Sequence, residues 1–242
     1  FCGDNELKRS DVEFIQINDL NNDYIKEVKN LKYFENESNF LWESSFLRIF
    51  NLYELAKKLN IDSFIHFDCD VLIYKPYKSI KNSFVDGKIN ITPLNEIFLN
   101  FSYSYINNLE NFKNTCDSLI EIIKNSNHYE KKYYEGQRLN EMIMLNIAYI
   151  KNPENFNLLK VLPENDCEYI FDPGSYGQYI GGTHNKLFSK KFINDDHYVG
   201  RKILSEGYKI FFQNGIPTVR HLNKTYKLVN LHVHSKKLKK YV

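Results

Sequence analysis

The sequence predicts an α/β fold in which a mixed central sheet is flanked by helices. Residues 43–59 carry apolar side chains at helical spacing, and the apolar run F-I-H-F at 64–67 follows after a short turn with the length of a buried strand. The same order recurs later, where a helix expected over 195–206 stops at Gly207 and is followed by a strand over 208–212. Alternation of helices and strands favours this class over a helical bundle or a β-sandwich.

The remaining elements fit one domain. In the helix at 43–59, two lysines occupy the last turn and Asn60 is a suitable left-handed stop. Further helices are expected over 109–123 and 139–149, and a short strand over 12–17. A loop-rich stretch with prolines and glycines occupies 163–182. No repeat or linker interrupts the 242 residues, so we expect a single domain over 1–242, with an opening strand missing if residues precede Phe1.

Composition and charge exclude several classes of protein. Hydrophobic residues make up 43% and charged residues 26%, as in globular proteins, and the net charge of +2 gives no reason to expect a nucleic-acid partner. The chain shows neither a signal peptide nor an apolar run long enough to span a bilayer, so a cytoplasmic location is expected. Peripheral membrane association is expected only through the basic tail, formed by Lys236, Lys237, Lys239 and Lys240. The cysteines are too widely spaced to indicate a zinc site or a disulfide framework.

The triplet Asp68-Cys69-Asp70 follows the strand expected at 64–67. On extended backbone the two carboxylates would point to the same side, roughly 6–7 Å apart. Ligands collect beyond the carboxyl ends of strands in α/β sheets, and carboxylates are preferred ligands of Mg²⁺ and Mn²⁺. The triplet therefore predicts a divalent metal site that bridges phosphates, with a solvated turn as the alternative interpretation.

A second candidate segment lies near the C-terminal end, in the run K-L-V-N-L-H-V-H-S-K at 227–236. In a strand, Val229, Leu231 and Val233 would face one way, and Asn230, His232 and His234 the other. One side is then apolar, and the other is a row of potential ligands, or simply the polar side of an edge strand.

The glycine-rich segment at 171–182, F-D-P-G-S-Y-G-Q-Y-I-G-G, combines glycines that permit close backbone approach with aromatic rings suited to a sugar. An ordinary tight turn is the alternative. No G-K-[ST] ending marks a phosphate loop, and neither a G-x-S-x-G elbow nor an H-E-x-x-H helix indicates a hydrolase.

The stretch from Ser44-Ser45-Phe46-Leu47-Arg48 to Phe67-Asp68-Cys69-Asp70-Val71-Leu72 resembles glycosyltransferases of the GT-A fold, which carry an arginine-bearing helix, a strand and a D-x-D-V-L block. The resemblance covers about 35 residues closely. It implies a GT-A-like (Rossmann-like) domain with D-x-D aspartates that bind a metal and a nucleotide diphosphate.

The resemblance also implies individual roles. Arg48 corresponds to a helix arginine that faces the donor, and Asp68, Cys69 and Asp70 to the block that binds the nucleotide-sugar. The late histidine followed by lysine resembles the element that completes the metal site, with His234 as the preferred ligand and His232 as its substitute. The resemblance therefore implies Asp68, Asp70 and His234 as metal ligands and Mn²⁺ or Mg²⁺ as the cofactor. It also implies that Lys236, or Lys237 in its place, meets the diphosphate.

Three carboxylates are candidates for the catalytic base. Asp172 lies in the glycine-rich segment, and Glu141 falls where retaining families place an acidic residue. Asp196 belongs to a pair similar to the acidic block of inverting enzymes, although Asn194 before the pair and His197 after it depart from that pattern. The sequence leaves the choice between them, and the stereochemistry, open.

The expected function is transfer of a sugar from a nucleotide-sugar, with a UDP-sugar as the expected donor, to a glycan, lipid-linked sugar or protein acceptor in polysaccharide biosynthesis. One alternative is a sugar nucleotidyltransferase, against which the absence of a glycine-rich basic loop near the start counts. The other is a non-catalytic module that binds nucleotide-sugars.

Overall fold

The computed structural model describes residues 2–3, 12–35, 40–164, 167–182 and 192–234. The chain divides into two compact units, each made of two separate stretches. Unit 1 comprises Phe1–Ser63 and Asn108–Lys151, and unit 2 comprises Phe64–Asn107 and Asn152–Val242.

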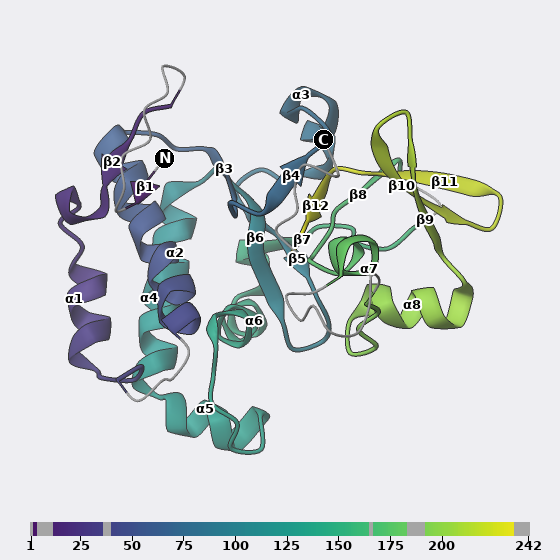
Figure 1. The fold of residues 1–242 in the computed structure, drawn as a ribbon. Coiled ribbons are helices and arrows are strands. Elements are labelled where there is room, and N and C mark those ends of the chain that lie inside the picture. Colours follow the sequence, from purple (N-terminus) through teal and green to yellow (C-terminus); the bar gives the residue numbers. More distant parts are fainter. Residues whose placement is uncertain (1, 4–11, 36–39, 165–166, 183–191, 235–242) are drawn as a thin grey trace. The chain divides into compact units, whose positions relative to one another are not determined.

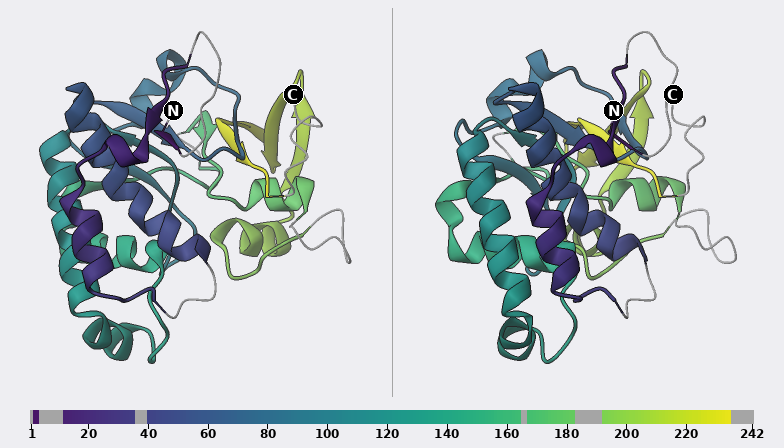
Figure 2. Two further views of the ribbon diagram at one scale, coloured as in Figure 1. Left: turned by 60° about the vertical axis from the view of Figure 1, so that its left-hand side comes forward. Right: turned by 90° about the vertical axis from the view of Figure 1, so that its left-hand side faces the viewer.

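Unit 1 is mainly helical. Its helices α1, α2 and α4 lie side by side in both views of Figure 2. The elements, labelled in Figure 1, are β1 (Cys2–Gly3), β2 (Ile15–Gln16), the short helix η1 (Ile17–Asp19), α1 (Asp23–Asn30), α2 (Phe40–Leu59), α4 (Leu109–Lys124), α5 (Ser126–Tyr133) and α6 (Glu141–Lys151). The two short strands pair in parallel.

Helix α2 confirms the prediction for residues 43–59 and begins three residues earlier. Most of its apolar side chains at helical spacing are buried, namely Phe46, Ile49, Phe50, Tyr53 and Ala56, and the last one, Leu59, is 38% exposed. Asn60 has φ +52°, its N–H donates to the carbonyl of Lys57, and the N–H of Ile61 donates to that of Ala56. These two bonds form the left-handed stop expected from the asparagine.

The other two predicted helices of unit 1 are also present. Helix α4 matches the expected range to within one residue, and the side chain of Asn108 caps it by accepting from the N–H of Asn111 at 2.8 Å. Helix α6 begins at Glu141, two residues later than expected. Helix α5 was not predicted.

Unit 2 contains the sheets. One four-stranded sheet has the order β3-β6-β5-β7 and another the order β8-β11-β10-β9, and both mix parallel and antiparallel neighbours. Strands β12 and β4 form an antiparallel pair. The strands are β3 (Phe64–Phe67), β4 (Val71–Ile73), β5 (Ile89–Pro93), β6 (Leu99–Ile106), β7 (Phe156–Leu158), β8 (Tyr169–Ile170), β9 (Lys209–Gln213), β10 (Ile216–His221), β11 (Lys224–Leu228) and β12 (Asn230–His232).

Single backbone hydrogen bonds connect these three groups of strands. The N–H of Leu159, after β7, donates to Ile91 of β5, and the N–H of Phe171, after β8, donates to Lys160. Val229 then donates to Ile170 and accepts from Tyr74. The strands of unit 2 therefore form one hydrogen-bonded network that runs from β3 to β4.

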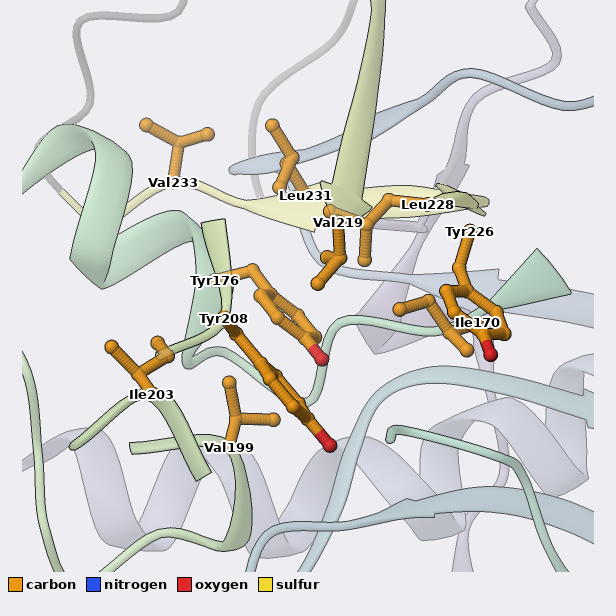
Figure 3. Packing of buried hydrophobic residues seen from close by; sticks show 10 residues of the cluster. All are labelled: Ile170, Tyr176, Val199, Ile203, Tyr208, Val219, Tyr226, Leu228, Leu231 and Val233. Carbon is orange, nitrogen blue, oxygen red and sulfur yellow. The ribbon is translucent and has the colours of Figure 1, made fainter. Parts of the chain in front are cut away.

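Helices α7 (Tyr176–Gly181) and α8 (Tyr198–Glu206) pack against this network, and the shorter helices of the unit are α3 (Tyr77–Ile80), η2 (Lys81–Ser83) and η3 (Pro153–Asn155). Figure 3 shows a buried cluster to which α7, α8 and the strands β8, β10, β11 and β12 all contribute side chains. Its members include Tyr176, Val199, Leu231 and Val233. A second buried cluster contains Val71, Phe171 and Val229.

The predicted fold class, α/β with a mixed sheet and flanking helices, is confirmed. Several details differ. Strand β3 lies at the edge of its sheet and is half-buried, with Phe67 50% exposed, because only β6 pairs with it. Helix α8 begins at Tyr198 and not at 195, since Asp195 and Asp196 form a turn before it. No helix among the described residues is long and apolar enough to cross a bilayer.

Candidate metal centre

The triplet Asp68-Cys69-Asp70 forms a turn between β3 and β4. The N–H of Val71 donates to the carbonyl of Asp68 at 3.0 Å, which closes the turn. The expected extended backbone is therefore wrong at this place, because the chain must reverse to lead β4 toward a different partner strand. The turn separates the surroundings of the two aspartates.

Strand β4 pairs with β12, so that Val71 lies opposite His232 and Leu72 opposite Leu231. The N–H of Val233 extends the ladder by donating to the carbonyl of Asp70 at 2.8 Å. This non-local pairing brings the end of the D-x-D turn beside the histidines near the chain's end.

Three potential metal ligands meet at this ladder. One ligating atom each of Asp70, His232 and His234 lies within 4.8 Å of the other two. Nε2 of His232 is 3.1 Å from Oδ1 of Asp70, and the two imidazole rings stack with their centroids 4.2 Å apart. The stacking agrees with the predicted alternation, which places both histidines on one side of the strand.

The apolar side of this segment is only partly as predicted. Leu231 and Val233 are buried together in the cluster that includes α7 and α8. Val229 is also buried, but it packs in the second cluster with Val71 and Phe171. Asn230 and His232 on the other side are buried as well, so that side is not a solvent-exposed polar face.

Asp70 and His232 each shift the pKa of the other. Burial disfavours the charged form of His232, but its hydrogen bond to Asp70 and the negative charge of Asp70 outweigh this and raise the pKa of the imidazole. Burial likewise raises the pKa of Asp70, and the hydrogen bond with His232 and the charges of His232 and His234 more than offset it, so the net direction is downward. The carboxylate is therefore held ionised, as a metal ligand must be.

These residues fit a divalent cation. Nδ1 of His232 is buried, and no described residue supplies it with a hydrogen-bond partner, so the ring is held by Asp70 on one nitrogen only. Two imidazoles and one carboxylate form a donor set that suits first-row transition metals better than Mg²⁺, which prefers oxygen. The sequence named His234 as the preferred ligand, whereas His232 makes the direct contact with Asp70.

Asp68 has different surroundings. Its Oδ1 lies 3.3 Å from Nε2 of His66, whose ring stacks on Phe101. Among the described residues, the group of potential metal ligands does not include Asp68. Its role as a ligand stays a prediction.

Asp172 is fully buried, and its carboxylate accepts hydrogen bonds from five backbone N–H groups. Burial raises the pKa of this carboxyl, and the N–H donors oppose the rise because they favour the charged form. Both oxygens are thus engaged with main chain. This arrangement favours a structural role over that of a base that meets an acceptor hydroxyl.

A second buried polar group follows in the same loop. Oγ of Ser175 lies 2.8 Å from Nδ1 of His197, and Nδ2 of Asn194 lies 3.0 Å from Nε2 of that ring. The N–H of Asp196 donates to Oδ1 of Asn194, which fixes the amide with Nδ2 toward the ring. His197 then carries its proton on Nδ1 and donates to Ser175, so the serine is not deprotonated by this imidazole. Burial lowers the pKa of His197 to about 4.

The other predicted site residues lie in several places. Arg48 and Glu141 belong to unit 1, where Nη2 of Arg48 is 3.2 Å from Oε1 of the buried Glu141. Cys69 is an exposed free thiol within the D-x-D turn, and Asp196 is exposed. Lys236 lies outside the described residues.

Sequence reasoning missed the hydrogen bond between Ser175 and His197, and it missed Asn230, whose side chain bonds the main chain of Asp172. The alternation of the C-terminal run already placed Asn230 on the side of the histidines, which was the one available signal.

The sequence matches no protein-family model and no curated protein. Among solved structures, the chain is similar to mouse xyloside xylosyltransferase 1 in its apo form, with a TM-score of 0.45 and 15% identity. The similarity covers 61% of this chain and 62% of that one, so the chain spans less than two thirds of the length of that structure.

Proposed function

We propose that the protein is a metal-dependent glycosyltransferase that uses a nucleotide-sugar donor, with a UDP-sugar as the specific expectation. The observation that carries the proposal is the convergence of Asp70, His232 and His234, whose ligating atoms lie within 4.8 Å of one another directly after a D-x-D turn. The sequence block around this turn, and the histidine followed by lysine, are the features in which the chain resembles GT-A glycosyltransferases.

In this proposal Asp70 and the two imidazoles hold the cation, and Asp68 is the further D-x-D ligand recruited when donor binds. A divalent cation bound at such a site neutralises charge on a departing diphosphate. The ladder between β4 and β12 fixes the backbone of Asp70 relative to His232, so the ligands keep their spacing. Mn²⁺ fits the donor set better than Mg²⁺.

Further residues are assigned to the donor and to proton transfer. Cys69 contacts the nucleotide-sugar through its exposed position in the turn, and Lys236 supplies positive charge for the diphosphate. The donor-binding role of Arg48, which belongs to the other unit, stays a prediction from the resemblance. Asp196 is the preferred base, because its carboxylate is exposed and belongs to the unit that carries the metal ligands. Glu141 is bound to Arg48 and Asp172 to five N–H groups, which makes them weaker candidates.

We propose that both compact units belong to one functional domain spanning 1–242. The chain passes from one unit to the other after Ser63, after Asn107 and after Lys151. Neither unit is a continuous segment, which is unlike domains joined in series by a linker.

The test is a screen of nucleotide-sugars with Mn²⁺ for hydrolysis and transfer. UDP-sugar cleavage that is lost with EDTA and in Asp70→Ala supports the proposal. The control is Asp86→Ala, an exposed aspartate of the same unit whose carboxylate accepts from Asn107. Asp86→Ala should retain turnover.

Other outcomes identify the alternatives. Turnover of a nucleoside triphosphate with a sugar phosphate would indicate a nucleotidyltransferase. Mn²⁺-dependent binding of UDP-sugars without turnover of any acceptor or water would indicate a binding module.

A further inference from the structure

The five hydrogen bonds to Asp172 divide between its two oxygens. Oδ1 accepts from the N–H groups of Gly174, Ser175 and Tyr176 at 2.8, 2.8 and 2.9 Å. This half of the carboxylate closes the turn that leads into α7. A local Asp turn of this kind needs no other part of the chain.

The second oxygen connects this turn to the metal centre. Oδ2 accepts from the N–H of Gly177 at 2.8 Å and from the N–H of His232 at 2.9 Å. One carboxylate therefore holds the loop and the backbone of a candidate metal ligand together.

Asn230 adds a second connection between the same two segments. Its Oδ1 accepts from the N–H of Asp172, and its Nδ2 donates to the carbonyl of Asp172, both at 3.1 Å. Asn230 and Asp172 are both fully buried, so these bonds are shielded from water. Residues 230 and 232 of β12 are thus both fixed to residue 172.

The loop also packs directly against the ligands. A Cβ atom on Gly177 would lie 1.9 Å from the carbonyl oxygen of His232, which no side chain permits. A Cβ atom on Gly174, whose φ is +103°, would lie 3.2 Å from Nε2 of His234 and 3.4 Å from Nδ1 of His232. Gly177 thus allows the loop to approach the main chain of His232, and Gly174 allows it to approach both imidazoles.

We propose that Asp172 is a positioning residue of the metal centre, which sets the place of His232 and His234 by holding β12 against the glycine-rich loop. The proposal rests on the proposed function only in requiring that these histidines bind a cation. It assigns Asp172 no contact with the substrate.

The variant Asp172→Asn distinguishes the hydrogen bonds of Oδ1 from those of Oδ2. The amide oxygen can still accept the three N–H groups of the turn. Its NH₂ group then faces the N–H groups of Gly177 and His232, where two donors meet and no bond forms. The variant retains the turn and loses the connection to His232.

The measurement is binding of Mn²⁺ alone by calorimetry, with urea denaturation of the metal-free protein beside it. Residues that support metal ligands typically change metal affinity ten- to a hundredfold, so we expect Mn²⁺ to bind folded Asp172→Asn about tenfold or more weakly than wild type. The visible spectrum of the Co²⁺-loaded variant should also differ from that of the wild type, because the imidazoles are displaced.

Asn90→Asp is the matched control. Asn90 is equally buried in unit 2, and its Nδ2 donates to the carbonyls of Val85, Lys88 and Tyr105. The change exchanges an amide and a carboxylate in the opposite direction, and it should lower stability while leaving the Mn²⁺ affinity of the folded protein unchanged.

If folded Asp172→Asn binds Mn²⁺ as tightly as the wild type and gives the same Co²⁺ spectrum, the positioning role is refuted, while the assignment of the metal ligands is unaffected. If the wild type itself binds neither ion, the proposed function fails and the positioning role with it. Should Asp172→Asn not fold, Asn230→Ala tests the same connection by removing the two bonds to the main chain of Asp172. Unchanged Mn²⁺ affinity in that variant would equally refute the role, and weakened affinity with a retained fold would support it.

Discussion

Nε2 of His232 lies 3.1 Å from Oδ1 of Asp70, across a strand pair that joins distant parts of the chain. The contact links a D-x-D aspartate to an imidazole whose other nitrogen is buried. A carboxylate and two imidazoles so arranged should bind first-row transition metals in preference to Mg²⁺.

The two imidazoles should make the centre bind transition metals more tightly than Mg²⁺. We expect Co²⁺ and Zn²⁺ to bind more tightly than Mn²⁺, and Mn²⁺ at least tenfold more tightly than Mg²⁺. Calorimetric titration with each ion checks this order. His234→Ala should reduce the preference for Mn²⁺ over Mg²⁺, and a wild type that prefers Mg²⁺ would contradict the assignment of the histidines as ligands.

Cys69 should report on occupation of the D-x-D turn. It is exposed, whereas Cys116 is buried, so N-ethylmaleimide should modify Cys69 faster than Cys116. UDP with Mn²⁺ should slow the modification of Cys69, as measured by mass spectrometry of the peptides. Cys69→Ser should still bind Mn²⁺. Equal labelling of Cys69 with and without UDP and Mn²⁺ would place the nucleotide elsewhere.

Loss of Arg48 alone from its ion pair with Glu141 should destabilise the protein more than replacement of both residues by apolar ones. The side chain of Glu141 is 5% exposed and that of Arg48 is 25% exposed. Arg48→Ala removes the guanidinium from a buried carboxylate, and we expect it to lower the free energy of unfolding by about 2–3 kcal/mol. Urea denaturation measures the loss. The double variant Arg48→Met with Glu141→Leu should recover part of the lost unfolding free energy, because no charge is left buried. A double variant less stable than Arg48→Ala would contradict the buried carboxylate of Glu141 as the cause of the loss.

His197 should make stability depend on pH below neutrality. The pKa of this buried imidazole is lowered from 6.5 to about 4 in the folded protein, so between these values the unfolded chain binds a proton that the folded chain does not. The free energy of unfolding should therefore be unaffected by this imidazole above pH 6.5. It should fall as the pH drops from 6.5 toward 4, by at most about 3 kcal/mol.

Urea denaturation of wild type and His197→Asn at pH 7.0 and pH 4.5 tests this. The difference in unfolding free energy between the two pH values should be smaller in the variant, and between pH 7.0 and 8.5 the two proteins should change in parallel. The same pH dependence in both proteins from 7.0 to 4.5 would exclude His197 as its source.

The features predictable from the sequence were those set by neighbouring residues. Helix α2 and its stop at Asn60 depend on apolar spacing and on one residue that tolerates positive φ, and both are readable locally. The alternation through His232 and His234 was readable for the same reason.

What the sequence missed depends on distant partners. Asp172 was one of three candidates for the base because it is a carboxylate among glycines. Its burial and its hydrogen bond to the N–H of His232 depend on a strand much later in the chain. The D-x-D triplet was expected to be extended, and it forms a turn because β4 pairs with β12 while β3 pairs with β6.

The pairing of β4 with β12 has a consequence for biosynthesis. A ribosome delivers Asp70 long before His232, and a parallel or antiparallel contact between such distant segments is slow to form because a long loop must close first. Until residues 230–232 emerge, the nascent chain lacks the segment with which residues 71–73 pair in the folded protein. A chain halted at residue 228 retains Asp70 but lacks both imidazoles, so capture of a cation by this centre would mark the completion of synthesis through His234.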